Sequence, residues 1–389
     1  MIQIFLLLAY WIGNIVRLPV TQDVTLLALD VLVAVVFVMH LPYFYTNRYM
    51  LMKQNLVKAT VFLVVALALS LVFAVPRYAL AHILQASMYL IRFVCYVSLL
   101  FIPLRLSHSF IKLLVAGFVT LGFAQYVLYP NLRYLLYLGW DDHYLRLFGS
   151  LFDPNFMGIM LVLMISTLLW RVDGKKSNHQ DYLLASIAFF ALLLTFSRSA
   201  FVVGFLTWVT TAALQRNAKL IIAIVLFFMC GVYLLPKNLP SEGGNLLRTK
   251  SISARSQEFA KAAAIIKTNP LFGVGFNTYR YARAQYFSTP PSGFPEHSAA
   301  GVPNSYLLIF ATAGICGLSL FIVWLGLLWQ SYAKLVSLAI PLLITYMLSG
   351  FFDNTMLYPF VMCWVFLMLK QTELSQKVET NHNRNHKVR

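Results

Sequence analysis

Residues 57–74 read VKATVFLVVALALSLVFA, and this stretch decides the fold class of the chain. Lys58 is its single charged residue, and nearly all the others are aliphatic or aromatic. A membrane-crossing helix needs about 20 mostly apolar residues, because its backbone N–H and C=O groups must pair within the helix where water is absent. The stretch therefore predicts a transmembrane helix.

Apolar runs of this kind recur along the whole chain. Hydropathy places candidate spans at 1–16, 24–42, 57–74, 80–103, 110–129, 155–171, 182–195, 199–215, 219–236, 303–330, 334–350 and 355–371. The first run lacks the basic start and the small-residue cleavage site of a signal peptide, so we expect it to be the first helix. The sequence thus predicts an all-α polytopic membrane protein with about 12 transmembrane helices.

The composition excludes other classes of protein. Hydrophobic residues make up 60% of the chain and charged residues 11%, whereas soluble domains carry about 25% charged residues. The net charge of +17 comes from basic residues scattered among short loops, so no nucleic-acid surface is predicted. The four cysteines lie in apolar runs without C-x-x-C spacing, which argues against a zinc site or a disulfide framework.

The positions of Lys and Arg orient the chain. Basic residues concentrate in the connections on one side of the spans and in the C-terminal tail, as is typical of the cytoplasmic side. The short loops on the other side hold only Arg17, Arg77, Arg133, Arg146 and Arg198. We therefore expect an inner-membrane protein with both termini in the cytoplasm. The arginines on the outer side need a separate explanation.

The connection at 237–302 is too long for a plain turn. It carries eight Lys and Arg against three Glu, which leaves +5 and suggests an anionic ligand. A helix is predicted at 253–266, with Ser253 as its N-cap and Pro270 beyond its end, so this is a long helical extracytoplasmic loop. We divide the chain into N-terminal transmembrane helices (1–130), a central transmembrane region with outer-face motifs (131–236), the long loop (237–302), C-terminal transmembrane helices (303–371) and a basic cytoplasmic tail (372–389).

Two outer-side motifs combine an arginine with the start of a helix. In the first, RLFG at 146–149 leads to DPN at 153–155, where the free amides of a helix N-terminus favour an anion. In the second, TFSRS at 195–199 forms a tight turn that fixes Arg198 between two helix ends. Each arginine has two interpretations, an anion-binding residue or an interfacial anchor.

Two further motifs lie on and after the long loop. Arg255 is followed by NPLFGVGF at 269–276, whose glycines permit close backbone approach but lack the third glycine and the strand of a dinucleotide-binding fingerprint. PNSYL at 303–307 opens the next span, in which Gly314 and Gly317 are spaced for close helix packing.

Taken in order, these motifs resemble the superfamily of bacterial O-antigen ligases and polysaccharide repeat-unit polymerases. The shared region runs from about 146 to 359 and includes a fifth motif, FFDN at 351–354 followed by Pro359. Each motif is weak alone. Five in this order, with the long loop between the third and the fourth, make a fairly specific match.

The resemblance implies a metal-independent membrane glycosyltransferase without a cofactor, which builds O-antigen, exopolysaccharide or capsule at the outer face. Its donor would be an oligosaccharide on undecaprenyl pyrophosphate, with Arg146, Arg198 and Arg255 as the catalytic clamp. Guanidinium groups suit this role, since they stay ionised and offer forked donors to phosphate oxygens. Implied partners are membrane lipids, a chain-length regulator and a repeat-unit flippase. The residues expected to bind substrate are Asn155, Gly273, Asn304, Tyr306 and His297.

One position favours the polymerase branch. Ligases of this family carry a histidine directly before the asparagine of the fourth motif, and here that position is Pro303. We therefore expect transfer of a lipid-linked glycan to the non-reducing end of another repeat unit. The alternatives are a ligase that moves a finished glycan to lipid A-core or another acceptor, and a polysaccharide transporter or flippase. The candidate general bases are Glu258, Glu296, His297 and Asp353.

Two side-chain groups each have two interpretations. Asp30 and Arg92 lie at similar depths in the second and fourth spans, so they form either a buried ion pair or part of a polar path. A cluster of aromatic residues forms either an interfacial belt, which we favour, or a stacking platform for sugar rings. Its members are Tyr126, Tyr129, Tyr134, Tyr137, Trp140 and Tyr144.

Overall fold

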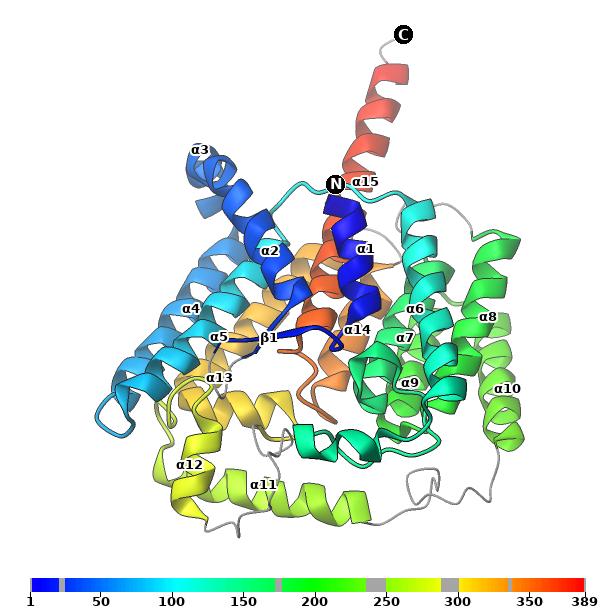
Figure 1. Ribbon diagram of the computed structural model, residues 1–389. Helices are drawn as coiled ribbons and strands as arrows, with labels where there is room; N and C mark the ends of the chain where they lie inside the picture. The colour runs from blue at the N-terminus through cyan, green and yellow to red at the C-terminus, as the bar shows by residue number, and fades with distance from the viewer. Residues whose placement is uncertain are drawn as a thin grey trace.

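The computed structural model is a bundle of helices with two helices lying across one end (Figure 1). It describes residues 2–20, 25–171, 177–235, 250–287, 301–334 and 338–387. The two crossing helices are α11 (Lys250–Thr268) and α12 (Tyr279–Tyr286), which we call the lid; the lid end is the end of the bundle that they cover. The sheet found in the described residues is one antiparallel pair, β1 (Arg17–Pro19) and β2 (Thr25–Leu27). The all-α fold class is confirmed.

Several helices have the length and composition to cross a membrane. In the described parts of the chain these are α4 (Asn55–Ala74), α5 (Leu80–Ser98), α6 (His108–Leu128) and α13 (Ser305–Tyr332). The bent pair α2 (Ala28–Met39) and α3 (Leu41–Met52) raises the number from four to five if it is one span. The shorter apolar helices are α1 (Ile2–Ile12), α7 (Pro154–Leu169), α8 (His179–Leu194), α9 (Arg198–Leu214), α10 (Ala218–Leu234) and α14 (Ala339–Ser349). The chain is an all-α membrane protein, and the expected count of about 12 spans exceeds these four or five.

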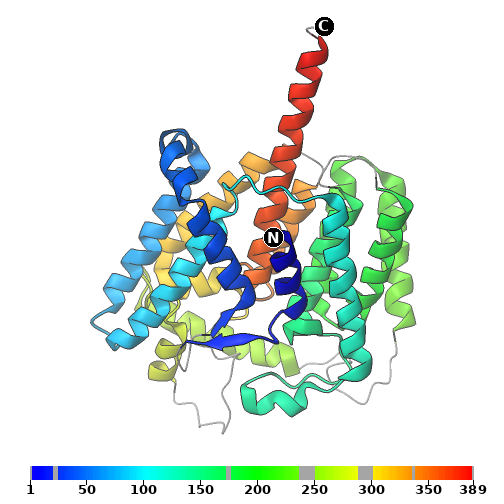
Figure 2. The ribbon, with the colours of Figure 1, turned by 45° about the horizontal axis from the view of Figure 1, so that its top comes forward.

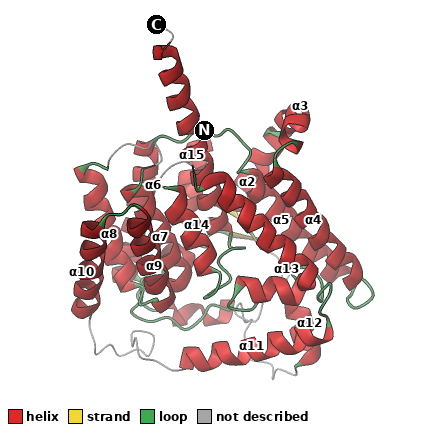
Figure 3. Cartoon of the chain, turned by 180° about the vertical axis from the view of Figure 1, so that it is seen from behind, coloured by secondary structure: helices red, strands yellow, loops and turns green. Residues whose placement is uncertain are grey.

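The apolar run predicted as a span at 24–42 contains α2, and α2 meets α3 at an angle of 66°. Pro42 stands in the first turn of α3, where a missing N–H is harmless, but its ring would disrupt a continuous helix. His40 occupies the bend, and its Nδ1 lies 2.8 Å from the carbonyl oxygen of Val36. Seen from behind, α3 stands clear of the other helices at the end opposite the lid (Figure 3).

Several helices begin at the lid end, among them α7, α9, α13 and α15 (Pro359–Lys387) (Figure 1). Asp153, Ser197 and Asn304 cap the first three, and each side chain accepts a hydrogen bond from a backbone amide of the first turn. The N-terminal end of a helix carries a partial positive charge from its aligned peptide dipoles. The starts of these helices therefore add positive potential to this end of the bundle.

A break in α13 fastens the lid to the bundle. Gly314, inside this helix, has φ +66° and ψ −168°, a conformation that is essentially restricted to glycine. Residues 269–276, which we call the strap, connect the end of α11 towards α12 and run beside the break. The amide of Gly275 donates to the carbonyl of Thr312 at 2.8 Å, so the strap pairs with peptide groups of α13.

The ion pair expected between the second and fourth spans is confirmed. Nη2 of Arg92 lies 2.7 Å from Oδ2 of Asp30, and the carboxylate is 5% exposed. The hydroxyl of Tyr96 donates to Oδ1 of Asp30 at 2.9 Å, so both carboxylate oxygens have partners. Such partners are needed because an isolated charge in this environment is costly.

Helix α15 runs through the middle of the bundle and continues past it at the end opposite the lid (Figure 2). Its residues 359–372 are buried. The hydroxyl of Tyr10 in α1 donates to the carbonyl of Phe360 at 2.9 Å, and Nδ2 of Asn14 donates to the hydroxyl of Tyr358 at 3.1 Å. Helices from the two ends of the described chain thus meet at the lid end.

Candidate active site

A cavity of about 1310 Å³ lies between the lid and the lid end of the bundle. Its described lining comes from β1, α5, residues 140–153, α7, α9, both lid helices and residues 352–359. Pockets for small molecules commonly measure about 300–1,000 Å³. This cavity therefore suits a larger, extended ligand.

Arginine dominates the charged lining. Among the described residues the cavity is lined by eight arginines and five carboxylates, which leaves a net charge of +3 with histidine neutral. The arginines are Arg17, Arg92, Arg133, Arg146, Arg198, Arg255, Arg280 and Arg283. The carboxylates are Asp141, Asp142, Asp153, Glu258 and Asp353. A recess with this excess of positive charge attracts anions.

Arg146 is buried, with 3% of its surface exposed, and it both lines the cavity and makes structural hydrogen bonds. Its Nε donates to the carbonyl of Thr195 at 2.8 Å, and Nη2 donates to the carbonyl of Phe196 at 3.4 Å. It thereby holds the turn before α9 against the segment that leads into α7. Its charge also lies close enough to Asp153 to stabilise that carboxylate.

Arg198 is the first residue of α9 and lines the cavity. The preceding Ser197 donates from Oγ to Oδ1 of Asn155 at 2.9 Å, which ties the start of α9 to the first turn of α7. Arg198 and Arg255 are close enough for their charges to repel each other. An anion between the two guanidinium groups would remove this repulsion.

Arg255 reaches from the lid to the loop between α14 and α15. Its Nη1 donates to the carbonyl of Phe352 at 2.6 Å, and its Nη2 donates to Oδ2 of Asp353 at 3.0 Å. A guanidinium group has five N–H donors, so these two bonds leave others for a ligand. Arg255 therefore both fixes the lid and faces the cavity.

Three of the lining carboxyl groups differ in their pKa. Glu258 accepts from Lys261 at 2.7 Å and from Arg283 at 2.9 Å, and these bonds lower its pKa despite partial burial. Burial raises the pKa of Asp153, although the amides that it caps oppose the rise. Burial raises the pKa of Asp353 to about 7, against the opposing effect of Arg255.

Comparison with protein families finds a match over the central part of the chain. Residues 183–322 match a family described as O-antigen ligase. The match supports the O-antigen ligase and polymerase superfamily, whose members are membrane glycosyltransferase-like enzymes, and so confirms the resemblance found in the motifs. No curated protein sequence matches the chain.

The residues that match this family include two of the three arginines of the predicted clamp. Arg198 and Arg255 lie within the matched residues, whereas Arg146 precedes them. The structure brings all three to one cavity, although they are far apart in the sequence. Asp353, which binds Arg255, lies after the matched residues.

The residues expected to bind substrate divide into two groups. Asn155 lines the cavity, while Gly273, Asn304 and Tyr306 are not part of its described lining. A Cβ on Gly273 would lie 2.4 Å from the backbone of Thr312, so this glycine packs the strap against α13. Asn304 caps α13, and the hydroxyl of Tyr306 donates to the carbonyl of Met347 at 2.9 Å. His297 and the candidate base Glu296 lie outside the described residues.

Among the described residues, five lining arginines lie outside the predicted clamp, namely Arg17, Arg92, Arg133, Arg280 and Arg283. Arg17, one of the arginines of the short outer loops, has its guanidinium carbon 4.1 Å from the ring centre of Trp140 in the cavity wall. Arg92, considered for an ion pair or a polar path, pairs with Asp30 and also lines the cavity. The position of Arg17 against the positive-inside rule was a signal in the sequence, but it did not separate a site residue from an anchor.

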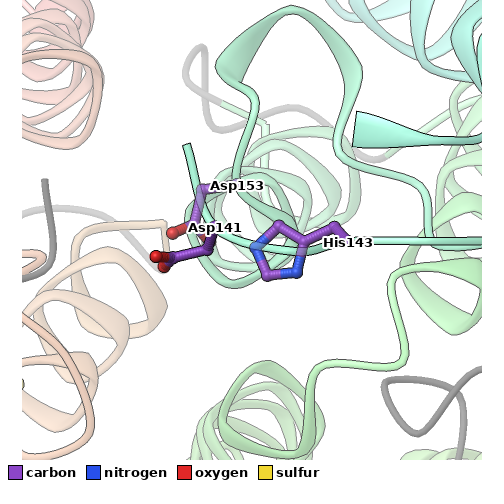
Figure 4. A group of neighbouring side chains, drawn as sticks. All are labelled: Asp141, His143 and Asp153. Atoms are coloured by element: carbon purple, nitrogen blue, oxygen red, sulfur yellow. The ribbon is translucent and has the colours of Figure 1, made fainter. Parts of the chain in front are cut away.

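Asp141, His143 and Asp153 each bring one potential ligand atom within 4.8 Å of the others (Figure 4). Carboxylate and imidazole groups are the donor types of several divalent cations. However, Oδ1 of Asp153 already accepts from the backbone at the start of α7, and arginines are in excess around it. The group has suitable donors, but the surrounding charge disfavours a cation.

The aromatic cluster contains both residues that line the cavity and residues that lie outside its described lining. Trp140 and Tyr144 line the cavity, whereas Tyr134 and Tyr137 are 69% and 59% exposed and lie outside its described lining. Trp140 packs edge-on to Phe152, with 5.0 Å between ring centres. Part of the cluster is therefore placed to meet a ligand.

Proposed function

We propose that this protein polymerises undecaprenyl-pyrophosphate-linked oligosaccharide repeat units at the outer face of the bacterial inner membrane. It transfers the glycan of one lipid carrier to the non-reducing end of another repeat unit. The observation that carries the proposal is the convergence of Arg146, Arg198 and Arg255 on one cavity at the lid end. The membership of residues 183–322 in the O-antigen ligase family supports a glycan substrate.

The chemistry needs a positive site, because negative charge grows on the pyrophosphate as its bond to the sugar breaks. Fixed cations around that charge lower the barrier by stabilising the transition state. Arg198 and Arg255 lie close together and both line the cavity, so they are the proposed contacts to the pyrophosphate. Arg146 keeps Arg198 in place through the carbonyl groups of Thr195 and Phe196. In this proposal arginine alone neutralises the leaving group, so no metal or cofactor is required.

The membrane arrangement is part of the proposal. About 12 helices or half-helices traverse or enter the bilayer, both termini are cytoplasmic, and the lid faces outward. The lipid carrier reaches the cavity from the membrane. A repeat-unit flippase supplies the substrate, and a chain-length regulator is a further expected partner.

A ligase is the second candidate, since the matched family is described as O-antigen ligase. Such an enzyme would move a finished glycan to lipid A-core or another acceptor. Pro303 lines the cavity where ligases of the family carry histidine, and proline cannot accept a proton. This position therefore favours the polymerase.

A deletion strain separates the candidates. Loss of a polymerase leaves surface glycan one repeat long, whereas loss of a ligase leaves long chains on the carrier lipid. Loss of a flippase instead strands single units on the cytoplasmic side. We expect the first result, and either of the others contradicts the proposal.

Complementation of that strain tests the arginine clamp. Arg198→Ala should lower the rate of chain growth by at least about 100-fold, the usual cost of one donor to a developing anion. Arg198→Lys keeps the positive charge but loses the forked pair of N–H donors, so its rate of chain growth should lie between those of the wild type and Arg198→Ala. The matched control is Arg48→Ala, which removes an exposed arginine from α3 at the opposite end. Full-length glycan from Arg198→Ala at normal expression would refute the clamp.

A further inference from the structure

The acceptor hydroxyl must lose a proton during transfer. The described carboxylates of the cavity differ in how well their surroundings let them accept that proton. Asp142 pairs with Arg133 at 2.7 Å, and both side chains are about half exposed. Oδ1 of Asp153 accepts from two backbone amides. Glu258 is held by Lys261 and Arg283, which keep it ionised and weakly basic.

Asp353 has a different environment. Its side chain is 15% exposed, and within the described part of the chain the side-chain hydrogen bond that it accepts is at Oδ2, from Nη2 of Arg255. That leaves Oδ1 able to face a hydroxyl group in the cavity, which Asp353 lines. A base that serves in proton transfer needs this combination of a fixed orientation and an accessible oxygen.

The loop that carries Asp353 is rigidly attached to the start of α13. The amide of Ser305 donates to the carbonyl of Gly350 at 2.7 Å, and its Oγ donates to the carbonyl of Asp353 at 3.1 Å. Nδ2 of Asn304 donates to the carbonyl of Phe351 at 3.1 Å. Asp353 is thereby tied to the segment that follows Pro303, and both residues line the same cavity.

We infer that Asp353 is the general base for the acceptor hydroxyl, an assignment that rests on the proposed transferase function. The Asp353 carboxylate takes the hydroxyl proton while the acceptor oxygen bonds to the anomeric carbon of the donor. The bond between that carbon and the pyrophosphate oxygen breaks, and its electron pair leaves with the pyrophosphate beside Arg198 and Arg255. Asp353 then releases the proton to solvent.

The charges around Asp353 agree with this role. Arg255 of α11 favours its ionised form, whereas Asp153 before α7 and Asp141 in the adjoining segment oppose it. Together with burial they leave the pKa of Asp353 at about 7. A base is most effective when its pKa lies near the working pH.

The test uses the full-length protein in proteoliposomes with a lipid-pyrophosphate-linked oligosaccharide as substrate. Wild-type kcat should rise with pH and level off above about 7. Asp353→Asn should lose this rise and lower kcat by about 100- to 10,000-fold. Binding of undecaprenyl pyrophosphate, measured by competition, should be unchanged. Asp353→Glu should keep part of the activity with a displaced pH midpoint. The matched control is Glu373→Gln, which exchanges a carboxylate for an amide in the middle of α15, where Glu373 pairs with Lys370.

The outcomes separate the two proposals. A wild-type protein without transfer activity overturns the proposed function and the base together. An active wild type whose Asp353→Asn variant keeps its kcat and pH profile overturns the base alone. If Asp353→Asn fails to fold, Asp353→Glu decides, since an unchanged midpoint in that variant contradicts the assignment.

Discussion

Gly314→Ala should detach the strap from α13 and destabilise the lid. A Cβ at this position would lie 2.2 Å from the carbonyl oxygen of Leu271 and 2.3 Å from its carbonyl carbon. Both are backbone atoms, so the strap itself has to move. The amide of Ile315 donates to the carbonyl of Pro270 at 2.8 Å, and this bond lies next to the clash. The substitution thus strains the backbone and breaks the attachment at the same point.

The expected loss of stability follows from three contributions. Placing alanine in this glycine-restricted conformation costs about 1–3 kcal/mol, and overpacking costs about as much again. Each strap hydrogen bond that breaks adds about 0.5–1.5 kcal/mol. A total of at least about 3 kcal/mol is a large part of the 5–15 kcal/mol typical of folded proteins.

The assay is thermal unfolding of the protein purified in detergent, with transfer activity measured in parallel. A loss of at least about 3 kcal/mol corresponds to a fall in Tm of about 5 °C or more. Gly326→Ala is the matched control, because it lies in the same helix with nothing within 4 Å of a new Cβ. Alanine there gains helix propensity and should not lower Tm. Equal melting of the two variants would show that the strap does not hold the lid.

Three other predictions concern the cavity wall, the lid and the membrane arrangement. Trp140→Ala should raise KM for the lipid-linked donor about 3- to 10-fold by removing an aromatic surface, while Tyr137→Ala should not; equal effects would exclude a sugar-stacking role. Glu258→Gln should lower Tm at pH 7. The lowered pKa of Glu258 makes its contribution complete above the ordinary value of about 4.3, and the contribution disappears as the pH falls through the lowered value. A difference in Tm that persists at lower pH is incompatible with this ion-pair role. In a variant without its four native cysteines, a cysteine at Lys267 should react with an impermeant maleimide in intact cells. One at Lys219 should react only after permeabilisation, and the reverse pattern would invert the topology.

Much of the fold could be predicted from the sequence, because membrane helices depend on local hydropathy. The helix expected at 253–266 is confirmed as α11, which ends at Thr268 before Asn269 and Pro270. The bend between α2 and α3 was missed, although Pro42 was visible. Hydropathy averages over a window, and a proline near the end of an apolar run changes that average little.

The site was only partly predictable, because its contacts join distant parts of the chain. The motifs identified Arg146, Arg198 and Arg255, and the structure places them around one cavity. The bond between Arg255 and Asp353 joins residues 98 positions apart, and no local pattern indicates it. Gly273 shows the opposite difficulty, since a glycine needed for packing has the same sequence signature as one beside a ligand.

The meeting of α1 and α15 at the lid end determines when the protein can become active during synthesis. Tyr10 and Phe360, which share a hydrogen bond, are 350 positions apart. At about 5–20 residues per second the ribosome needs roughly 20–70 s to travel between them. Once Arg255 has been synthesised, the growing chain still lacks the wall that carries Tyr358. A nascent or truncated chain in the membrane therefore has no complete cavity, and enzymatic competence arrives only with insertion of the final helix.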